Sequence, residues 1–196
     1  MKTKLASVVV LLLCCSVISS AQAKQKKAAA EPKTIAKVLD DSLAGVEREF
    51  VSAADAMPED KYDYAPTNGE FKGVRTFAEE VRHVAFVNHV VLAGFLGDKA
   101  PGETLGENGP PELKTKADIM KYLKDSFAYA HRAFATVTPK NAVAPLANPF
   151  GGKEPVTRLG MSTLIVGHCF DHYGQMVEYL RSNGIVPPAS RPRQGS

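Results

Sequence analysis

The sequence predicts an all-α protein built as a four-helix bundle. Four segments carry apolar residues at steps of three and four, the spacing of an amphipathic helix. No segment alternates apolar and polar residues for long enough to build a sheet, and the stretches between the four segments are rich in Pro and Gly. Four helices of about 20 residues, each with one apolar face, bury those faces most simply against one another.

The first helix is expected over residues 34–57 and the second over residues 76–97. Apolar residues recur along both segments at helical spacing. Thr76 and Glu79 stand three apart, as in a capping box, which places the start of the second helix. Gly97 is the residue type that ends a helix most readily, so it marks the expected end.

The third helix is expected over residues 115–138 and the fourth over residues 156–183. Thr115 and Asp118 repeat the spacing of an N-terminal cap at the start of the third helix. Gly184 stands directly after the fourth segment, where a left-handed residue commonly closes a helix.

The connections between the expected helices are long, covering residues 58–75, 98–114 and 139–155. At about 3.3 Å per extended residue, each can cross the full length of a helix of roughly 30 Å. The connections therefore permit crossovers and do not require a simple up-down-up-down order. Long loops of this kind often carry function.

Residues 1–23 have the pattern of a secretory signal peptide. A basic start, "MKTK", precedes a short apolar run, and Ala-Gln-Ala ends at Ala23 as a cleavage signal. The sequence therefore predicts an exported protein, periplasmic or extracellular, with no stable membrane insertion after cleavage. Residues 24–33 are expected to form a flexible basic tail, residues 34–186 the bundle and residues 187–196 a C-terminal tail.

Charge and cysteine content narrow the function classes. The formal net charge of +3 falls to +1 once Lys2 and Lys4 leave with the signal, so no electrostatic argument favours nucleic acid. Cys14 and Cys15 leave as well, because neither follows the small residue that precedes a lipidated cysteine. The exported chain keeps Cys169 alone, so no internal disulfide can form.

Histidines on the fourth helix suggest a metal site. His168 and His172, in "VGHCFDHYGQ", are four residues apart and share one face, on the stripe expected to point inward. His83, midway along the second helix, could meet them from a facing helix. Three imidazoles leave an open position for water or substrate, as in catalytic zinc sites, and they also suit nickel, iron or copper. Alternatively, His83 and His172 are hydrogen-bonded core residues and His168 lies at the surface.

Other polar residues near these histidines have weaker cases. Asp171 and Gln175 each follow one of the paired histidines by three residues, so either could orient an imidazole from behind. Asp171 equally fits a solvated face. Cys169 is adjacent to a histidine in sequence, but consecutive helix positions point about 100° apart, so it is expected to be a small buried side chain. His89 and His131 are expected to lie away from the site.

Over residues 35–186 the chain resembles the DinB-like superfamily, a group regarded as metalloenzymes. The resemblance rests on "AMPEDKYDYAPTNGEF", on "FAEEVRHVAFVN" and on "HCFDHYGQMVEYLRSNGIVPPAS", which looks like the closing segment of exported members. It implies an up-down-down-up bundle and a divalent metal, zinc or nickel before iron, held by His83, His168 and His172.

Two function classes follow. The first is a metal-dependent enzyme of the hydrolase or transferase type, acting on a small molecule that the sequence does not identify. Some members of the superfamily use a cytosolic thiol such as bacillithiol or mycothiol, and an exported protein would be separated from that pool. The second is a non-catalytic metal- or ligand-binding protein of the cell envelope. A homodimer is compatible with either class.

Overall fold

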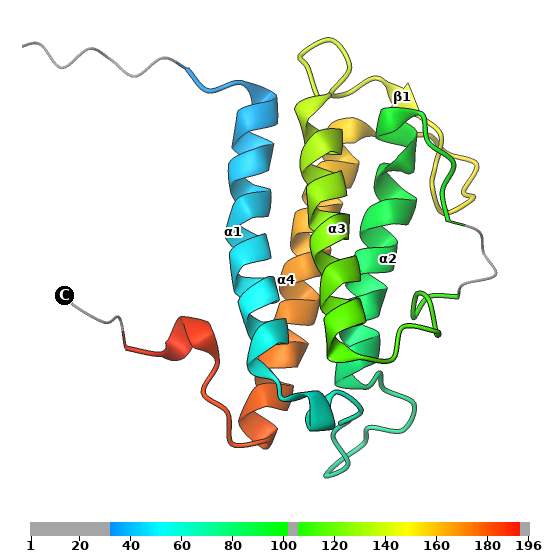
Figure 1. The fold of residues 1–196 in the computed structure, drawn as a ribbon. Coiled ribbons are helices and arrows are strands. Elements are labelled where there is room, and N and C mark those ends of the chain that lie inside the picture. The colour runs from blue at the N-terminus through cyan, green and yellow to red at the C-terminus, as the bar shows by residue number, and fades with distance from the viewer. Residues whose placement is uncertain (1–31, 102–105, 193–196) are drawn as a thin grey trace, which may run out of the picture. The chain divides into compact units, whose positions relative to one another are not determined.

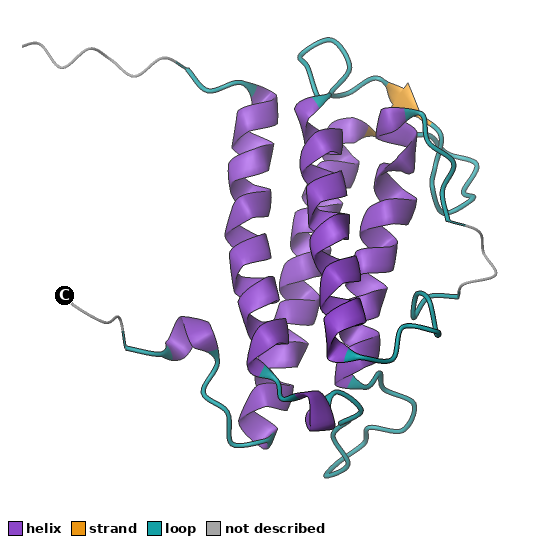
Figure 2. Ribbon diagram, viewed as in Figure 1, coloured by secondary structure: helices purple, strands orange, loops and turns teal. Residues whose placement is uncertain are grey.

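The computed structural model describes residues 32–101 and 106–192, and these form a bundle of four helices (Figures 1 and 2). The four are α1 (Ile35–Ala56), α2 (Phe77–Leu96), α3 (Lys116–Ala135) and α4 (Arg158–Ser182). The predicted fold class is confirmed. The predicted signal peptide lies outside the described residues. None of the described helices is long and apolar enough to cross a membrane.

Short elements lie in the segments outside the four helices. Two are single turns of 3₁₀ helix, η1 (Glu59–Lys61) and η3 (Pro188–Ser190), and two are strands, β1 (Pro145–Leu146) and β2 (Val156–Thr157). The two strands pair antiparallel, with Pro145 opposite Thr157 and Leu146 opposite Val156. The fourth helix was expected to begin at Val156, and this start was wrong by two residues. Val156 and Thr157 are extended in β2, and the Thr157 hydroxyl then accepts a hydrogen bond from the Gly160 amide at 3.1 Å as the N-cap of α4.

The order of the helices agrees with the up-down-down-up arrangement implied by the resemblance. Both α1 and α2 pack against α3 and α4, so α1 and α2 lie on one diagonal of the bundle. In Figure 1, α1 and α4 run in one direction while α2 and α3 run in the other. The long connections make this order possible, because each crosses the bundle or runs along it. As a result, α2 and α4 are neighbours.

Side-chain caps fix where the helices begin. Thr34 and Thr115 each accept a hydrogen bond from the backbone amide three residues on. Thr76 and Glu79 form the complete capping box that was predicted from their spacing. Gly97 has a φ of 73°, the left-handed conformation that ends α2. These caps set the rotation and height of α2, and with them the position of every side chain that it carries.

Apolar side chains from all four helices fill the interior. The largest fully buried ones include Leu43, Phe50, Phe77, Phe127, Phe134, Leu123, Ile165 and Met176. Truncating a buried side chain of this size to Ala typically costs about 2–5 kcal/mol. This apolar packing helps to hold α2 beside α4.

Candidate metal centre

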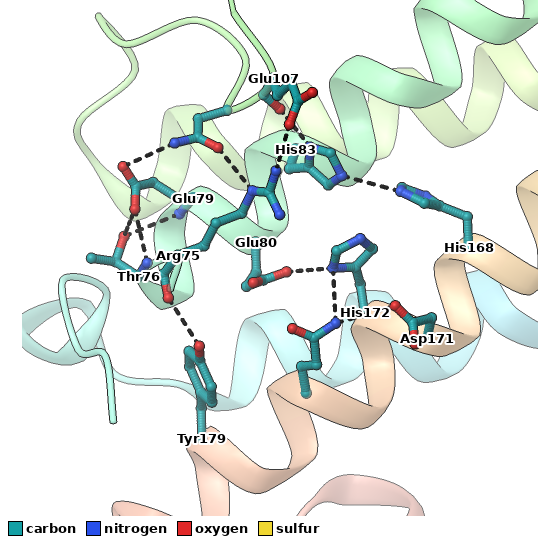
Figure 3. A network of polar contacts seen from close by, with 12 residues as sticks. Arg75, Thr76, Glu79, Glu80, His83, Glu107, His168, Asp171, His172 and Tyr179 are labelled. Carbon is teal, nitrogen blue, oxygen red and sulfur yellow. Dashed lines mark hydrogen bonds and ion pairs between the residues drawn. The ribbon is translucent and has the colours of Figure 1, made fainter. Parts of the chain in front are cut away.

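Three histidines meet where α2 faces α4 (Figure 3). His83 comes from the middle of α2, and His168 and His172 come from consecutive turns of α4. One ring nitrogen from each lies within 4.8 Å of the other two. The Nε2 atoms of His83 and His168 are 3.1 Å apart. The convergence of these three side chains, predicted from sequence, is therefore confirmed.

The buried stripe of α4 explains this placement. Ile165, Cys169, His172 and Met176 are all buried and follow one another at steps of three and four. His172 therefore lies on the stripe itself. His168 lies one turn before it, at the edge of the stripe, and is half-buried. The same helical period that buries the apolar residues directs both imidazoles toward α2.

A backbone carbonyl orients the His83 ring. Its Nδ1 lies 2.5 Å from the carbonyl oxygen of Glu107. A carbonyl can only accept a hydrogen bond, so Nδ1 must carry the proton. The lone pair is then on Nε2, which faces His168. The long connection between α2 and α3 thereby selects the tautomer that a metal ligand needs.

A buried carboxylate orients the His172 ring. The Nδ1 atom of His172 lies 2.5 Å from Oε2 of Glu80, and both side chains are buried. A carboxylate behind the imidazole holds the ring and leaves its Nε2 free for an ion. The sequence reasoning missed Glu80. Its signal was present, because Glu80 stands three residues before His83 on α2 and therefore lies close to the same face.

The loop that carries Glu107 is held in place by hydrogen bonds to Arg75 and Glu79 (Figure 3). Arg75 donates to the Glu107 carboxylate at 3.2 Å and to the Asn108 side-chain oxygen at 2.8 Å. Asn108 in turn donates to Glu79 at 3.3 Å, and the Tyr179 hydroxyl donates to the Arg75 carbonyl at 2.9 Å. These bonds link the loop, the start of α2 and the end of α4. The Glu107 carbonyl that contacts the His83 ring is thus positioned by a network of bonds and not by one contact.

Burial keeps His83 and His168 in the form that binds metals. Desolvation by burial lowers the pKa of His83. It lowers the pKa of His168 to about 3, with smaller contributions from the neighbouring His172 and His83. Both rings are therefore neutral at pH 7, with a lone pair available. A neutral imidazole loses no proton when it takes up an ion.

The cluster fits a divalent ion. Two nitrogens bound to one tetrahedral zinc at about 2.0–2.1 Å stand roughly 3.3 Å apart, close to the 3.1 Å between His83 and His168. The rings of His83 and His172 each have Nδ1 hydrogen-bonded to an acceptor on the side away from the cluster. The Nδ1 of His168 is buried without a protein partner among the described residues. Three imidazoles suit zinc, nickel or iron and leave one position open.

The two residues suggested as outer partners lie at the margin of the cluster. Asp171 is exposed and accepts a hydrogen bond from the Gln175 amide at 3.2 Å. The same amide nitrogen is 3.5 Å from Nδ1 of His172, whereas Glu80 is 1.0 Å closer at 2.5 Å. Glu80, reaching across from α2, therefore takes the position behind the ring that the sequence suggested for residues of α4.

The remaining histidines lie away from the cluster. His89 packs beside the Tyr129 ring, with 4.8 Å between centroids. His131 bridges α3 to α1, with Nδ1 2.5 Å from Asp40 and Nε2 2.9 Å from Glu47. Neither belongs to the group of side chains that could share an ion. Both therefore have structural contacts that account for them.

Cys169 is a buried side chain, as predicted. It is fully inaccessible, and burial raises the pKa of its thiol to about 12. Its sulfur lies 3.9 Å from the side-chain oxygen of Asn88. A thiol that stays protonated and inaccessible is unsuited to nucleophilic chemistry.

Comparisons with known proteins agree with the fold. Residues 42–176 match the family model described as DinB superfamily. A DinB-like protein from Bacillus cereus ATCC 10987 has 19% sequence identity and a TM-score of 0.63, covering 78% of this chain and 95% of that one. A conserved protein from Enterococcus faecalis has 14% identity and a TM-score of 0.62, covering 76% of this chain and 97% of that one. These two likenesses concern the fold. No curated protein matches the sequence significantly.

Proposed function

Because this chain belongs to the DinB superfamily and brings three imidazoles to one point between α2 and α4, we propose that it binds a divalent metal ion. The ligands are His83, His168 and His172. The observation that carries the proposal is their convergence, with ring nitrogens within 4.8 Å of one another. Glu80 adds to it, because its buried carboxylate stands where ligating histidines usually have an acceptor.

The protein's own groups set up the site. The Glu107 carbonyl and the Glu80 carboxylate each hold one ring with its Nε2 lone pair directed inward. Burial keeps His83 and His168 neutral, and apolar packing fixes the distance between the helices. A divalent ion bound there would polarise a substrate oxygen or lower the pKa of a water at the open position. Zinc and nickel suit the all-nitrogen donor set, and iron is compatible with it.

We propose that the site serves a metal-dependent enzyme of the hydrolase or transferase type acting on a small molecule. A cavity of about 590 Å³ beside His83 and His168 supports this, since its volume is typical of small-molecule sites. One observation favours the alternative of a non-catalytic binding protein. Glu80, the carboxylate nearest the cluster, is buried and engaged with His172, so it is not free to transfer a proton to a substrate.

Metal analysis of the purified protein tests the proposal. We expect close to one zinc or nickel ion per chain, measured by plasma mass spectrometry after dialysis against trace metal. His83→Ala, His168→Ala and His172→Ala should each lower occupancy sharply, since each removes one of three ligands.

Matched controls are available in the same chain. His89→Ala, His131→Ala and Cys169→Ser alter residues outside the cluster and should keep the metal. If the wild-type protein takes up no divalent ion, or if His89→Ala lowers occupancy as much as His83→Ala does, the three-histidine proposal is wrong.

A further inference from the structure

The cavity beside the histidine cluster has a mostly apolar lining. It lies between α2 and α4 and reaches His83 and His168 at one side. Its apolar lining side chains are Phe86, Val87, Val90, Phe150 and Leu164. A polar cluster with an open coordination position therefore adjoins a hydrophobic cavity, which is the environment of a ligand with two unlike ends.

Part of this apolar lining is exposed in the protein alone. Phe150 is 59% exposed and Leu164 is 37% exposed. Phe150 belongs to the connection between β1 and β2. The β1–β2 hairpin packs against α2 through Leu146 of β1. The Leu146 side chain lies so close to Gly94 of α2 that a Cβ built at Gly94 would be 3.7 Å from it. The hairpin thus places Phe150 over the cavity, and a ligand could remove its ring from water.

The charged side chains around the cavity disfavour an anionic group anywhere except at the proposed metal ion. Glu107 and Asp171 line it and both are exposed, and the described lining residues include no Lys or Arg. Arg75 lies nearby, but its guanidinium is already bonded to Glu107 and Asn108. Away from the proposed metal ion, a phosphate or carboxylate group in the cavity would meet two carboxylates and would find no Lys or Arg among the described lining residues.

We propose that the substrate class of this site is an uncharged amphiphilic small molecule, with a metal-binding head group beside His83 and His168 and an apolar chain along Phe86, Val90 and Leu164. This inference rests on the proposed metal site and deepens it. The head group supplies the polar donor at the open position, and the chain fills the apolar cavity.

Gly167 offers a way to test the cavity directly. It lines the cavity on α4, and a Cβ built there meets no atom of the described part of the chain within 4 Å. Gly167→Leu should therefore project into the cavity without displacing the backbone. Gly174 lies two turns further along α4, is equally open within 4 Å and does not line the cavity. Both substitutions raise helix propensity by a similar amount, so Gly174→Leu is a matched control.

The first experiment titrates metal-loaded protein with n-alkyl hydroxamic acids from acetyl to octanoyl, which are uncharged in solution near pH 7 and release a proton to solvent when they chelate an ion. Affinity should rise roughly two- to fourfold per methylene, as expected for a chain that enters an apolar site. A hydroxamic acid of the same length whose apolar end carries a carboxylate should bind about tenfold more weakly or worse. Gly167→Leu should abolish the gain with chain length while Gly174→Leu retains it, and both should keep the wild-type metal content.

A second experiment separates the cavity from the metal. The matching n-alkanamides, which lack the chelating hydroxyl, are added to metal-free protein, and methyl NMR signals of Val87, Val90 and Leu164 are followed. Shifts in these signals that grow with chain length support the apolar part of the inference even if no ion binds. In that case the proposed function fails, together with the metal-binding role of the head group. Metal-loaded protein whose hydroxamate affinity is independent of chain length, or which prefers the carboxylate-ended analogue, overturns the inference and leaves the metal site intact. Metal-free protein whose methyl signals stay unchanged overturns it as well.

Discussion

At the scale of single residues, the Glu80–His172 pair is the contact that most directly tunes the candidate site. Glu80→Gln keeps the size of the side chain and removes its charge, so the His172 ring loses its anionic acceptor. We expect metal affinity to fall about 10–100-fold with the fold unchanged, as is usual when a partner behind a ligand is altered. Competition with a chromophoric chelator measures the affinity.

Asp171→Asn is the comparison for that variant. Asp171 is also close to the cluster, but its described hydrogen bond is to Gln175. We expect the affinity to change by no more than about threefold, within the range of an outer charge screened by solvent. Equal losses in Glu80→Gln and Asp171→Asn would show that charge near the site, and not the contact with His172, controls binding.

His131 gives the bundle a pH-dependent contact between α3 and α1. Burial opposes its protonation, but hydrogen bonds to Asp40 and Glu47 outweigh that effect and raise its pKa above 6.5. Lys37, whose ammonium lies 3.8 Å from Asp40, also faces this group. A raised folded pKa contributes stability that is complete below the unfolded pKa and is lost as pH rises through the folded pKa.

His131→Gln should therefore cost more stability in mild acid than in mild base. Because the three side chains are partly exposed, we expect the difference between about pH 6 and about pH 9 to be roughly 0.5–1 kcal/mol. Urea unfolding of both proteins at the two pH values measures it. For His89→Gln the sign should reverse, since burial lowers the pKa of His89. A pH-independent cost for His131→Gln would remove the ion-pair explanation.

The histidine ligands could be predicted from sequence, whereas their partners could be predicted only in part. The helical spacing of His168 and His172 predicts that they share one face, and the position of His83 midway along another helix predicts that it can meet them. Glu80 also has helical spacing to His83, but its contact is made to His172 across the bundle. The Glu107 carbonyl has no sequence signal at all, because any residue at that position offers the same atom.

At the scale of elements, caps and apolar periodicity predicted three helix starts within one residue. The start of α4 differs because Val156 and Thr157 pair with Leu146 and Pro145. A ladder of two residues is too short to produce an alternating pattern, so its only trace was the apolar Val156, which fits a helix equally well. The pairing with β1, a tertiary contact, makes Val156 part of a strand and not of the helix.

Gly109 shows how an element is positioned by close approach. Its φ is +68°, and a Cβ there would lie 2.9 Å from the Arg82 carbonyl oxygen. Gly109→Ala should destabilise the protein by about 1–3 kcal/mol and weaken metal binding, because the loop that presents the Glu107 carbonyl to His83 must move away from α2. Chemical unfolding and chelator competition measure the two effects.

Gly106→Ala separates backbone strain from the close approach. Gly106 also has a positive φ, +65°, but a Cβ there meets no atom of the described residues within 4 Å. The Gly106→Ala variant should lose stability through backbone strain alone and keep the metal affinity of the wild type. If Gly106→Ala weakens metal binding as much as Gly109→Ala, then backbone strain in the loop, and not loss of its close approach to α2, is what displaces the Glu107 carbonyl from the His83 ring.

At the scale of the whole molecule, we propose that the chain is exported and cleaved. The first helix of the bundle, α1, begins at Ile35, after the predicted signal and basic tail. We expect intact-mass measurement of the exported protein to give an N-terminus at Lys24, directly after Ala-Gln-Ala. A mass that includes residues 1–23, or one raised by a lipid, would contradict this.

The metal should also act on the stability of the whole bundle. Its ligands come from α2 and α4, which are separated in sequence by α3, so unfolding of either helix destroys the site. An ion that binds only the folded chain stabilises it by RT ln(1 + [L]/Kd), about 2.7 kcal/mol at one hundred times Kd. For a domain of this size, that corresponds to a rise in Tm of roughly 5–10 °C. Apolar packing places the helices without the ion, so the metal-free protein should still unfold cooperatively, at the lower temperature.

Calorimetry with zinc or nickel, with and without chelator, tests this last prediction. The wild-type Tm should rise with free metal concentration, and His83→Ala should show no such rise while it keeps a cooperative transition. His131→Ala, which leaves the three ligands in place, should respond as the wild type does. If His83→Ala and the wild type gain equally, the ion is binding elsewhere, and the three imidazoles are core residues held by Glu80 and the Glu107 carbonyl. If the metal-free wild type shows no cooperative transition, then apolar packing alone does not assemble the site, and binding must be coupled to folding.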